Sequence, residues 1–289
     1  MSMSKVISIV NMKGGVGKTT LSVALADYIG AIWRKPVCLV DLDAQSNASF
    51  AMCGEERYAN LIRERRTIDH FFLSNGKVLG SGEPLSEFIT GQVSRLEELP
   101  RISLVASSPR LRMVERQLLV KLARQNLFDQ ELEGRVGSAL REGFREITSS
   151  GSFVIVDSAP GISGFSVAAL KASDLVIAPI NPDYLSRIGL ELLGREILPD
   201  IRREGRPKLV AILTKLRTGV TYPRRSDFED EAFQKAVGFS MMDTIIPMNA
   251  DLGRMVEEGD IIQTVSSKYD TGLDAMMQFG AEVRKLLED

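Results

Sequence analysis

The amino-acid sequence predicts an α/β protein with a doubly wound, mostly parallel sheet and helices on both faces. Six or seven short runs rich in apolar and β-branched residues recur along the chain, and stretches with helical spacing of apolar residues separate them. Several of these runs are apolar throughout, which is typical of parallel strands that are buried on both faces. No linker, repeat or low-complexity tract interrupts the alternation, so we expect one domain over residues 1–289.

A strand, a glycine-rich turn and a helix follow one another at the start of the chain. Residues 6–10 form the apolar strand, and the helix covers residues 18–34. Backbone N–H groups converge in such a turn and the helix dipole adds positive potential, so the turn favours an anion such as phosphate. Lys18 is expected to reach the β- and γ-phosphates, and the Thr19 hydroxyl to hold Mg²⁺. The residues expected to form the phosphate cradle are Gly14, Gly15, Val16, Gly17, Lys18, Thr19 and Thr20.

The loop departs from the general phosphate-loop pattern, because Met12 occupies the position where that pattern has its first glycine. The segment KGGVGKTT, with an additional Lys13, resembles the deviant Walker A motif of the ParA/MinD family of ATPases, in particular the small Soj-like ParA proteins. The resemblance implies ATP and Mg²⁺ as cofactors. It also implies a homodimer in the ATP state, in which Lys13 crosses the interface to the partner's nucleotide and neutralises charge during hydrolysis.

The next buried run, residues 37–41, ends close to two carboxylates, Asp41 and Asp43. The carboxyl edge of an open α/β sheet is where ligands bind. The segment DLDAQSN resembles the second motif of the same family, with Ala44 in place of the usual proline. The resemblance implies that Asp43 orients the attacking water and that Asp41 supports the Mg²⁺ shell. Capping of the following helix is the alternative, and it explains one of the two carboxylates better than both.

The segment from Cys53 to Pro100 is polar and predicts only short helices, and the resemblance is weakest there. His70, the one histidine, has no nucleophile context around it, so we expect it to be packed or at the surface. Cys38 and Cys53 indicate a reduced cytosolic protein rather than a disulfide scaffold. They lack the spacing of a metal or iron–sulfur site, although a symmetric dimer could share such ligands.

The apolar run at residues 151–161 predicts another buried strand, which ends in Asp157. A carboxylate at that place can hold a Mg²⁺-bound water opposite Thr19. The resemblance further implies that the loop after a late strand contacts adenine, and in this chain that loop contains Pro247 and Met248.

The remaining chain continues the alternation of strands and helices. The apolar spacing predicts a helix over residues 183–199 and a last helix over residues 271–287. Between them, Ser226 and Glu229 have the spacing of a capping box, which predicts that a helix opens at the start of residues 226–237.

The formal net charge of −2 and the pI of about 5.7 do not indicate nucleic-acid binding by bulk charge, so DNA contact requires a local basic patch. The resemblance implies that the ATP dimer binds double-stranded DNA without sequence preference, and that a ParB-like or cargo-adaptor protein stimulates hydrolysis. Ordinary solvated charge is the alternative for each basic residue. Arg217, in the segment LRTG, falls where relatives carry a DNA-contacting Arg-Thr pair. The candidates are Arg202, Arg203, Lys215, Arg217, Arg224 and Arg225.

The function expected from these residues is an ATP-dependent dimerising switch that partitions plasmid or chromosomal DNA, or positions a protein cargo, in the cytoplasm at the nucleoid. A MinD-like membrane switch is one alternative, but it uses a basic amphipathic C-terminal helix and AEVRKLLED is acidic at its tip, so we expect no membrane partner. A metabolic ATP-dependent ligase of the same fold is the other, and it has no need of Lys13. We find neither a signal peptide nor an apolar run that could span a bilayer.

Overall fold

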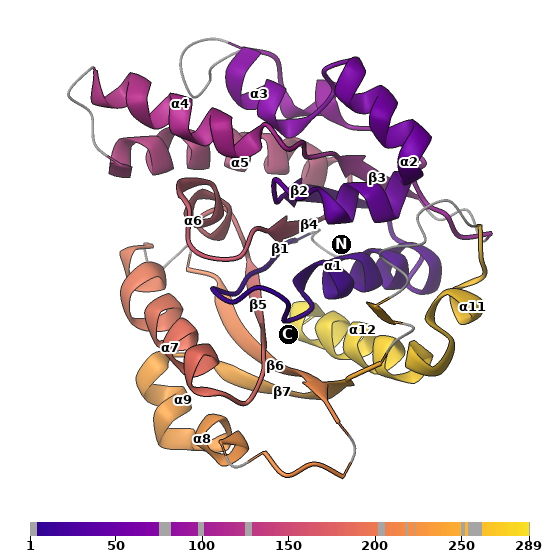
Figure 1. The fold of residues 1–289 in the computed structure, drawn as a ribbon, viewed down its shortest axis with the longest axis vertical. Helices are drawn as coiled ribbons and strands as arrows, with labels where there is room; N and C mark the ends of the chain where they lie inside the picture. Colours follow the sequence, from indigo (N-terminus) through magenta and orange to yellow (C-terminus); the bar gives the residue numbers. More distant parts are fainter. Residues whose placement is uncertain are drawn as a thin grey trace.

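The computed structural model describes residues 5–74, 82–97, 101–124, 129–201, 206–217, 219–222, 224–249, 252–253 and 262–288. Within these residues, one sheet contains seven strands in the order β3-β2-β4-β1-β5-β6-β7 (Figure 1). All neighbouring strands are parallel, which confirms the predicted sheet. The strands are β1 (Val6–Ile9), β2 (Val37–Leu42), β3 (Ile102–Val105), β4 (Phe153–Ser158), β5 (Leu175–Ile180), β6 (Lys208–Leu216) and β7 (Ser240–Pro247).

Helices cover both faces of this sheet, as a doubly wound fold requires (Figure 1). The helices packed against one face are α1 (Lys18–Asp27), α2 (Asn47–Arg63), α11 (Val265–Tyr269) and α12 (Leu273–Glu288). Those packed against the other face are α3 (Ile68–Ser74), α4 (Leu111–Ala123), α5 (Asp129–Ser149), α6 (Gly164–Leu170), α7 (Tyr184–Leu192), α8 (Arg225–Glu229) and α9 (Glu231–Val237).

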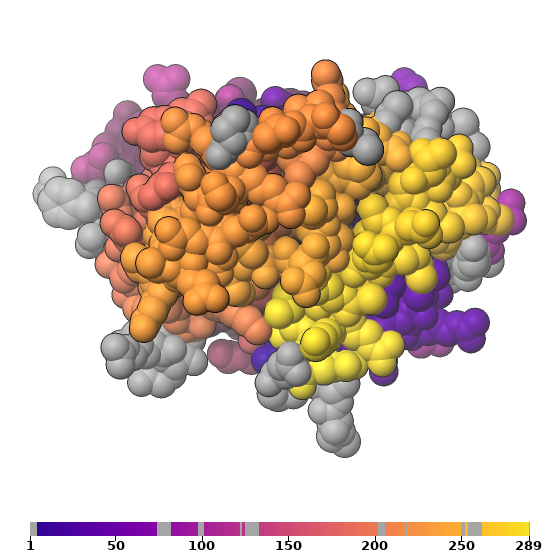
Figure 2. Space-filling model, turned by 90° about the horizontal axis from the view of Figure 1, so that it is seen from below, coloured from indigo at the N-terminus to yellow at the C-terminus, as the bar shows by residue number. Residues whose placement is uncertain are grey.

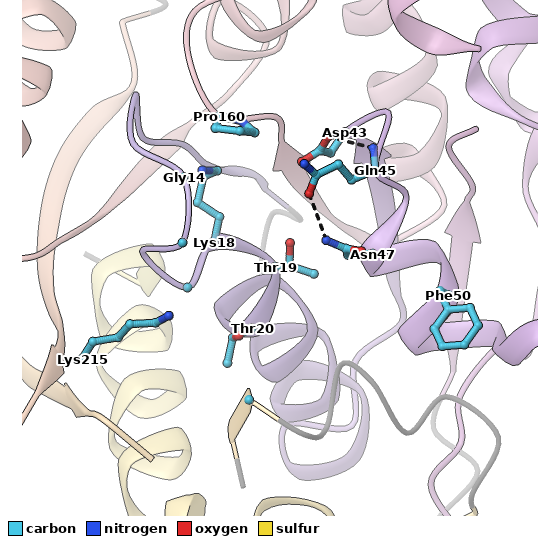
Figure 3. Close-up of a pocket in the computed structure, with 13 residues that line it drawn as sticks. Gly14, Lys18, Thr19, Thr20, Asp43, Gln45, Asn47, Phe50, Pro160 and Lys215 are labelled. Carbon is cyan, nitrogen blue, oxygen red and sulfur yellow. Dashed lines mark hydrogen bonds between the residues drawn. The ribbon is translucent and has the colours of Figure 1, made fainter. Parts of the chain in front are cut away.

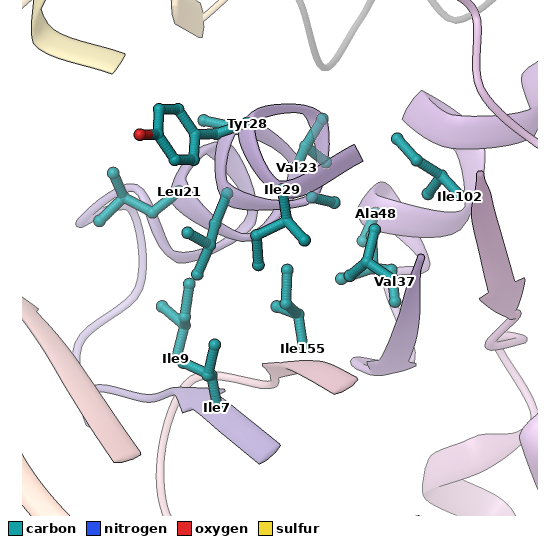
Figure 4. Close-up of a cluster of buried hydrophobic side chains, with 14 of the residues drawn as sticks. Ile7, Ile9, Leu21, Val23, Tyr28, Ile29, Val37, Ala48, Ile102 and Ile155 are labelled. Carbon is teal, nitrogen blue, oxygen red and sulfur yellow. The ribbon is translucent and has the colours of Figure 1, made fainter. Parts of the chain in front are cut away.

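The first helix is fixed by apolar contacts with the central strands. Figure 4 shows Ile29 pointing from the first helical segment toward Ile155 of β4. Leu21 of the same segment and Ile9 of β1 belong to the same cluster, and all four side chains are buried. Each fully buried side chain of this size contributes about 1.5–3 kcal/mol relative to an exposed one. The helix that follows the glycine turn is therefore held firmly against the sheet.

Two predicted helices change their helix type before they end. The helix predicted over residues 18–34 is α-helical only to Asp27 and continues as a π-helix, η1 (Tyr28–Ile32). The helix predicted over residues 183–199 likewise ends as α7 at Leu192 and continues as η3 (Leu193–Ile197) and η4 (Leu198–Asp200).

The predicted capping box at Ser226 and Glu229 is wrong. Ser226 lies inside α8, and this helix ends at Glu229. Asp230 then caps a second helix, α9, because its carboxylate accepts hydrogen bonds from the backbone N–H groups of Ala232 and Phe233 at 2.7 and 3.2 Å. The stronger cap at Asp230 therefore divides the predicted helix into two. The last helix agrees with its prediction, since α12 covers Leu273–Glu288.

The strand order brings the important sequence segments to one edge. Strand β4 lies between β1 and β2, and Asp157 of β4 is in register with Asp41 of β2 and Ile9 of β1. The glycine turn leaves the carboxyl end of β1 at the same edge. Three segments far apart in the sequence thus meet at the carboxyl edge of the sheet, where ligands bind in this class of fold.

Candidate phosphate-binding site

The glycine turn between β1 and α1 has the backbone conformation of an anion-binding loop. Gly15 and Gly17 have φ values of 73° and 92°, in the left-handed region where glycine is strongly favoured. Gly17 is the N-cap of α1 and provides no side-chain cap. The first N–H groups of α1 therefore remain available to a ligand, in addition to those of the turn.

Lys18 carries a largely buried ammonium group inside this loop. It is 6% exposed, and its Nζ donates a hydrogen bond to the backbone carbonyl of Lys13 at 3.0 Å. Burial lowers the pKa of Lys18, while the nearby carboxylates of Asp157 and Asp43 oppose this shift. A buried cation at the end of a glycine loop is suited to binding a phosphate group.

Asp157 joins the end of β4 to the first turn of α1. Its carboxylate accepts hydrogen bonds from Thr19 Oγ1 at 2.8 Å and from Ser22 Oγ at 2.9 Å. Burial is the main cause of a raised pKa at Asp157, and the two hydroxyl hydrogen bonds oppose it. The hydroxyl and the carboxylate expected at the metal are therefore in direct contact, and such oxygen donors are the ones that Mg²⁺ prefers.

Asp41 is fully buried, and both of its carboxylate oxygens accept hydrogen bonds within the protein. One oxygen accepts from the backbone N–H of Asp43 at 2.9 Å, and the other from the backbone N–H and the hydroxyl of Ser49 at 2.9 and 2.7 Å. Burial raises the pKa of Asp41, and the charge of Asp157 adds to the shift. Since Ser49 is in the first turn of α2, Asp41 also accepts a hydrogen bond from the N-terminal turn of that helix, as the capping alternative predicts.

A cavity of about 730 Å³ opens beside the glycine loop (Figure 3). Asp43 lies at this cavity and is 6% exposed, and its Oδ1 accepts a hydrogen bond from the Gln45 backbone N–H at 2.9 Å. Figure 3 shows Asp43, Gln45 and Asn47 together on one side of the cavity, and Lys215 on the other. The lining residues are Gly14, Gly15, Gly17, Lys18, Thr19, Thr20, Asp43, Gln45, Asn47, Phe50, Pro160, Lys215 and Gly253.

A second, narrower cavity of about 130 Å³ adjoins the first, since the two share Gly17, Thr20, Lys215 and Gly253. It contains Pro247 and Met248, the residues expected at adenine. Its other lining residues are Val16, Leu21, Thr214, Ile246, Asn249 and Leu252. A polar cavity and a mostly apolar one therefore lie side by side, which suits the phosphates and the base of one nucleotide.

Lys13 lies outside the lining of both cavities, as far as the described residues show. Its Nζ is 2.6 Å from Asp183 Oδ2, and each of the two side chains is about one third exposed. Asp183 is also the N-cap of α7, because it accepts a hydrogen bond from the Ser186 backbone N–H at 2.9 Å. Burial raises the pKa of Asp183, but the bonds from Lys13 and Ser186 outweigh it and hold that pKa below its usual value.

Of the six basic residues proposed for DNA contact, the four that the structure describes do not line one surface. Arg202 and Arg203 lie outside the described residues. Lys215 lines the cavities described above, while Arg217 and Arg225 line a separate hollow of about 470 Å³ with Tyr222. Figure 2 shows a face on which the orange residues, the colour range of α8, α9 and β7, lie beside the yellow residues of the C-terminal helix α12. Arg224 is 3.6 Å from Asp227, and Arg225 is 2.7 Å from Glu229, so both contact carboxylates.

Sequence reasoning missed several cavity residues. Gln45 and Asn47 belong to the segment DLDAQSN but were not singled out, although their place just after Asp43 could have indicated them. Phe50 gave no signal, because an aromatic residue in a helix is usually a core residue. No helix among the described ranges is long and apolar enough to cross a membrane. These ranges also contain no group of three or more His, Cys, Asp or Glu residues that could hold a metal by themselves.

Comparison with known proteins identifies relatives along most of the chain. The family model AAA_31, described as an AAA domain, matches residues 4–210. The chain is 24% identical over 297 residues to the chromosome partitioning protein ParA of Myxococcus xanthus, with 98% of this chain and 89% of that protein covered. It is 27% identical over 289 residues to the chromosome-partitioning ATPase Soj of Thermus thermophilus, with 98% and 96% covered.

Solved structures with the same fold include a metabolic enzyme and a DNA complex. Cobyrinic acid a,c-diamide synthase from Mycobacterium smegmatis, with bound ATP analog and magnesium, has a TM-score of 0.68 at 20% identity, covering 98% of this chain and 94% of that one. The pNOB8 ParA bound to nonspecific DNA has a TM-score of 0.66 at 17% identity, covering 99% of both chains. At these identities the likeness shows the fold.

Proposed function

Because the chain belongs to the AAA_31 family of ParA-, Soj- and MinD-type P-loop ATPases, we propose that it is an ATP-dependent dimerising switch that binds DNA without sequence preference. In this proposal, hydrolysis is slow until a ParB-like or cargo-adaptor protein stimulates it. The cycle partitions plasmid or chromosomal DNA or positions a protein cargo, and it takes place in the cytoplasm at the nucleoid.

One observation carries the proposal, namely the different positions of the two lysines of the loop. Lys18 is buried at the cavity of its own chain, whereas Lys13 is partly exposed beside Asp183 and away from that cavity. A lysine that acted only on its own nucleotide would be expected among the lining residues. The exposed place of Lys13 instead supports a role toward a second copy of the chain.

ATP binding is assigned to the glycine loop, Lys18 and the narrow cavity. The loop N–H groups and Lys18 bind the phosphates, Thr20 contacts the α-phosphate, and Pro247 and Met248 contact the adenine. Thr19 and Asp157 would hold Mg²⁺, and the bound ion would supply positive charge that neutralises phosphate oxygens. Both donors are already in contact at 2.8 Å, which supports their use at one metal.

Asp43 is assigned to the water that attacks the γ-phosphate. It lies at the cavity on the side opposite Lys215, and its backbone N–H donates to Asp41. Since both oxygens of Asp41 are engaged by Asp43 and Ser49, Asp41 contributes to the metal shell chiefly by positioning the loop that carries Asp43. Phosphoryl transfer depends mainly on such positioning and on charge neutralisation.

Dimerisation gives Lys13 its role in hydrolysis. On this proposal Lys13 leaves Asp183 and binds the partner's nucleotide, where it neutralises the charge that develops during phosphoryl transfer. The Asp183 carboxylate that it leaves stays at the N-terminus of α7, which favours negative charge. Opening the ion pair is therefore part of forming the dimer.

DNA binding is assigned to the basic residues beyond β6. The solved relative pNOB8 ParA is bound to nonspecific DNA, and Arg217 and Arg225 line one hollow of this chain. A dimer doubles the number of phosphate contacts, so the affinity of the dimer for DNA is expected to fall steeply with salt. Arg202 and Arg203 remain candidates without a structural description.

Binding to a double-stranded DNA of arbitrary sequence, in ATP and in ADP and at two salt concentrations, tests the proposal. The expected result is binding in ATP alone, equal for unrelated sequences and weakened by salt. An absence of binding in ATP, or binding that salt leaves unchanged, would contradict the DNA-carried switch. Turnover of a small carboxylic acid with ATP would instead indicate a metabolic ligase such as the synthase of the same fold.

A further inference from the structure

We propose that Lys215 is a nucleotide-binding residue rather than a DNA-binding one, and that its side chain spans the base and phosphate halves of the bound nucleotide. The inference rests on the proposed ATP binding. It reassigns one of the six basic residues that the sequence indicates as candidates for DNA contact.

The first observation is a bulge in the pairing of β6 with β7. Thr214 is paired with Ile246 and Leu216 with Pro247, so Lys215 is an extra residue on β6 without a partner on β7. Lys215 also has a φ of 59°, in the left-handed region that is unfavourable for a residue with a side chain. Bulges of this kind change the direction of a side chain and are common next to functional sites.

The residues on both sides of Lys215 are fixed, so the bulge redirects Lys215 alone. Thr214 is 1% exposed, and its hydroxyl donates to the Val16 carbonyl at 2.9 Å, which joins the end of β6 to the phosphate loop. Leu216 is 9% exposed and belongs to the apolar core beneath the sheet. Lys215 itself is exposed.

The second observation is the place to which Lys215 is directed. Figure 3 shows its side chain running from the end of β6 toward the glycine loop, on the side of the cavity opposite Asp43. Lys215 lines both the phosphate-side cavity and the narrow cavity that contains Met248. A lysine stem can cover apolar surface while its ammonium reaches a charged group, so one side chain suits both halves of a nucleotide.

The third observation concerns charge. No hydrogen bond or ion pair involves the Lys215 ammonium within the described part of the chain, whereas Arg224 and Arg225 contact carboxylates. A cation without a partner at an anion-binding cavity is available to a phosphate oxygen. Arg217, only two residues further, lines a different hollow with Tyr222, and its Nε donates to Met248 Sδ at 3.2 Å. Lys215 lines the phosphate-side cavity and Arg217 does not.

The test compares Lys215→Met with the wild-type chain. Methionine keeps most of the side-chain length and removes the charge, and Lys208→Met is the matched control because Lys208 is an exposed residue at the other end of the same strand. The dissociation constants for ATP and ADP are measured by isothermal titration calorimetry with Mg²⁺ present. We expect Lys215→Met to weaken ATP binding by about tenfold or more and Lys208→Met to leave it unchanged.

DNA binding at saturating ATP completes the test, and Lys215→Met is expected to retain it. Lys215→Gly, which removes the side chain and relieves the left-handed backbone, is expected to fold at least as stably as the wild type while losing the same ATP affinity. Unchanged ATP affinity in both variants would overturn the inference, as would loss of DNA binding alone. A wild-type chain that does not bind ATP would overturn the proposed function as well.

Discussion

At the scale of single residues, the surroundings of three lysines separate their roles. Lys18 is buried at the loop, Lys13 is paired with Asp183, and Lys215 is exposed at a bulge. The sequence motif identifies Lys18 and Lys13, because their spacing within KGGVGKTT is specific. The role of Lys215 could not be predicted, because nothing in the segment KLVAILTKL indicates a bulge.

The ion pair between Lys13 and Asp183 opposes dimerisation in the proposed cycle. Asp183→Asn removes the negative charge, while asparagine remains a good N-cap for α7. We expect the variant to dimerise at an ATP concentration a few-fold lower than the wild type requires, since partly exposed pairs contribute on the order of 1 kcal/mol. Sedimentation velocity across an ATP titration measures this. A higher ATP requirement in Asp183→Asn than in the wild type would contradict the expectation.

The buried carboxylate of Asp157 makes the metal-free protein sensitive to pH. Burial raises the pKa of Asp157, so the folded protein favours the protonated carboxyl group. The resulting stabilisation is fully present below about pH 4 and is lost as the pH rises through the raised pKa of the folded state. Without Mg²⁺ at neutral to alkaline pH, Asp157→Asn is therefore expected to be more stable than the wild type, by on the order of 1 kcal/mol.

Mg²⁺ with ADP is the complementary measurement on Asp157. It is expected to raise the melting temperature of the wild type and to have a much smaller effect on Asp157→Asn. Ser22→Ala is the control, because it removes one hydrogen bond to Asp157 and keeps the carboxylate. If Mg²⁺ raised the melting temperature of the wild type and of Asp157→Asn equally, Asp157 would not be a metal ligand.

At the scale of elements, the packing of α1 against its neighbours holds the phosphate loop. Asp27 at the end of α1 is buried and lies 2.6 Å from both Lys268 Nζ and Tyr269 Oη, which fixes α11 to α1. Burial next to Asp27 raises the pKa of Tyr269 well above its usual value, so Tyr269 acts as a hydrogen-bond donor there. Gly280 of α12 faces the Tyr28 ring at close range.

The contact between α12 and η1 depends on the absence of a side chain at Gly280. A methyl group there would overlap the Tyr28 ring, so Gly280→Ala is expected to lower the free energy of unfolding by about 1–3 kcal/mol. Gly134→Ala in α5 is the matched control, because no atom lies within 4 Å of the added methyl group. The control is expected to gain about 0.5–1 kcal/mol from helix propensity. Urea unfolding measures both, and equal effects would refute the packing argument.

Element boundaries show where sequence reasoning succeeds and where it fails. The central strands were predicted because runs such as FVIVDS are apolar throughout and end in turn residues. The boundary between α8 and α9 is not predicted, because the sequence contains two competing signals for a helix N-terminus. One is the pair Ser226 and Glu229, and the other is Asp230, four residues after Ser226. Which of the two signals caps a helix depends on which side chain can reach free backbone N–H groups. Tertiary packing determines this, and the local sequence does not show it.

At the scale of the whole molecule, the strand order determines which residues meet at the site. The register of β4 with β2 and with β1 puts Asp41, Asp157 and the phosphate loop at one edge of the sheet. The sequence predicts that these segments share the carboxyl edge, since every parallel strand ends there. It does not predict that β4 lies between β1 and β2, because strand order depends on contacts between segments distant in the chain.

The expectation of one domain over residues 1–289 stays a prediction, and unfolding tests it. The ring centroid of Trp33, the one tryptophan, is 4.8 Å from the ring centroid of Phe153 in β4, so its fluorescence reports on the core. A single domain is expected to lose tryptophan fluorescence and helical circular dichroism in one coincident transition. Two separate transitions would indicate two units.

In the proposed switch, ATP brings two copies of the chain together through Lys13. Light scattering after size-exclusion chromatography gives the molar mass directly, with Asp43→Ala used to slow hydrolysis. We expect one chain in ADP, two chains in ATP, and a single chain in ATP when Lys13→Ala is added to Asp43→Ala. A single chain in ATP for Asp43→Ala, or a dimer that persists with Lys13→Ala, would contradict the ATP-dependent dimer.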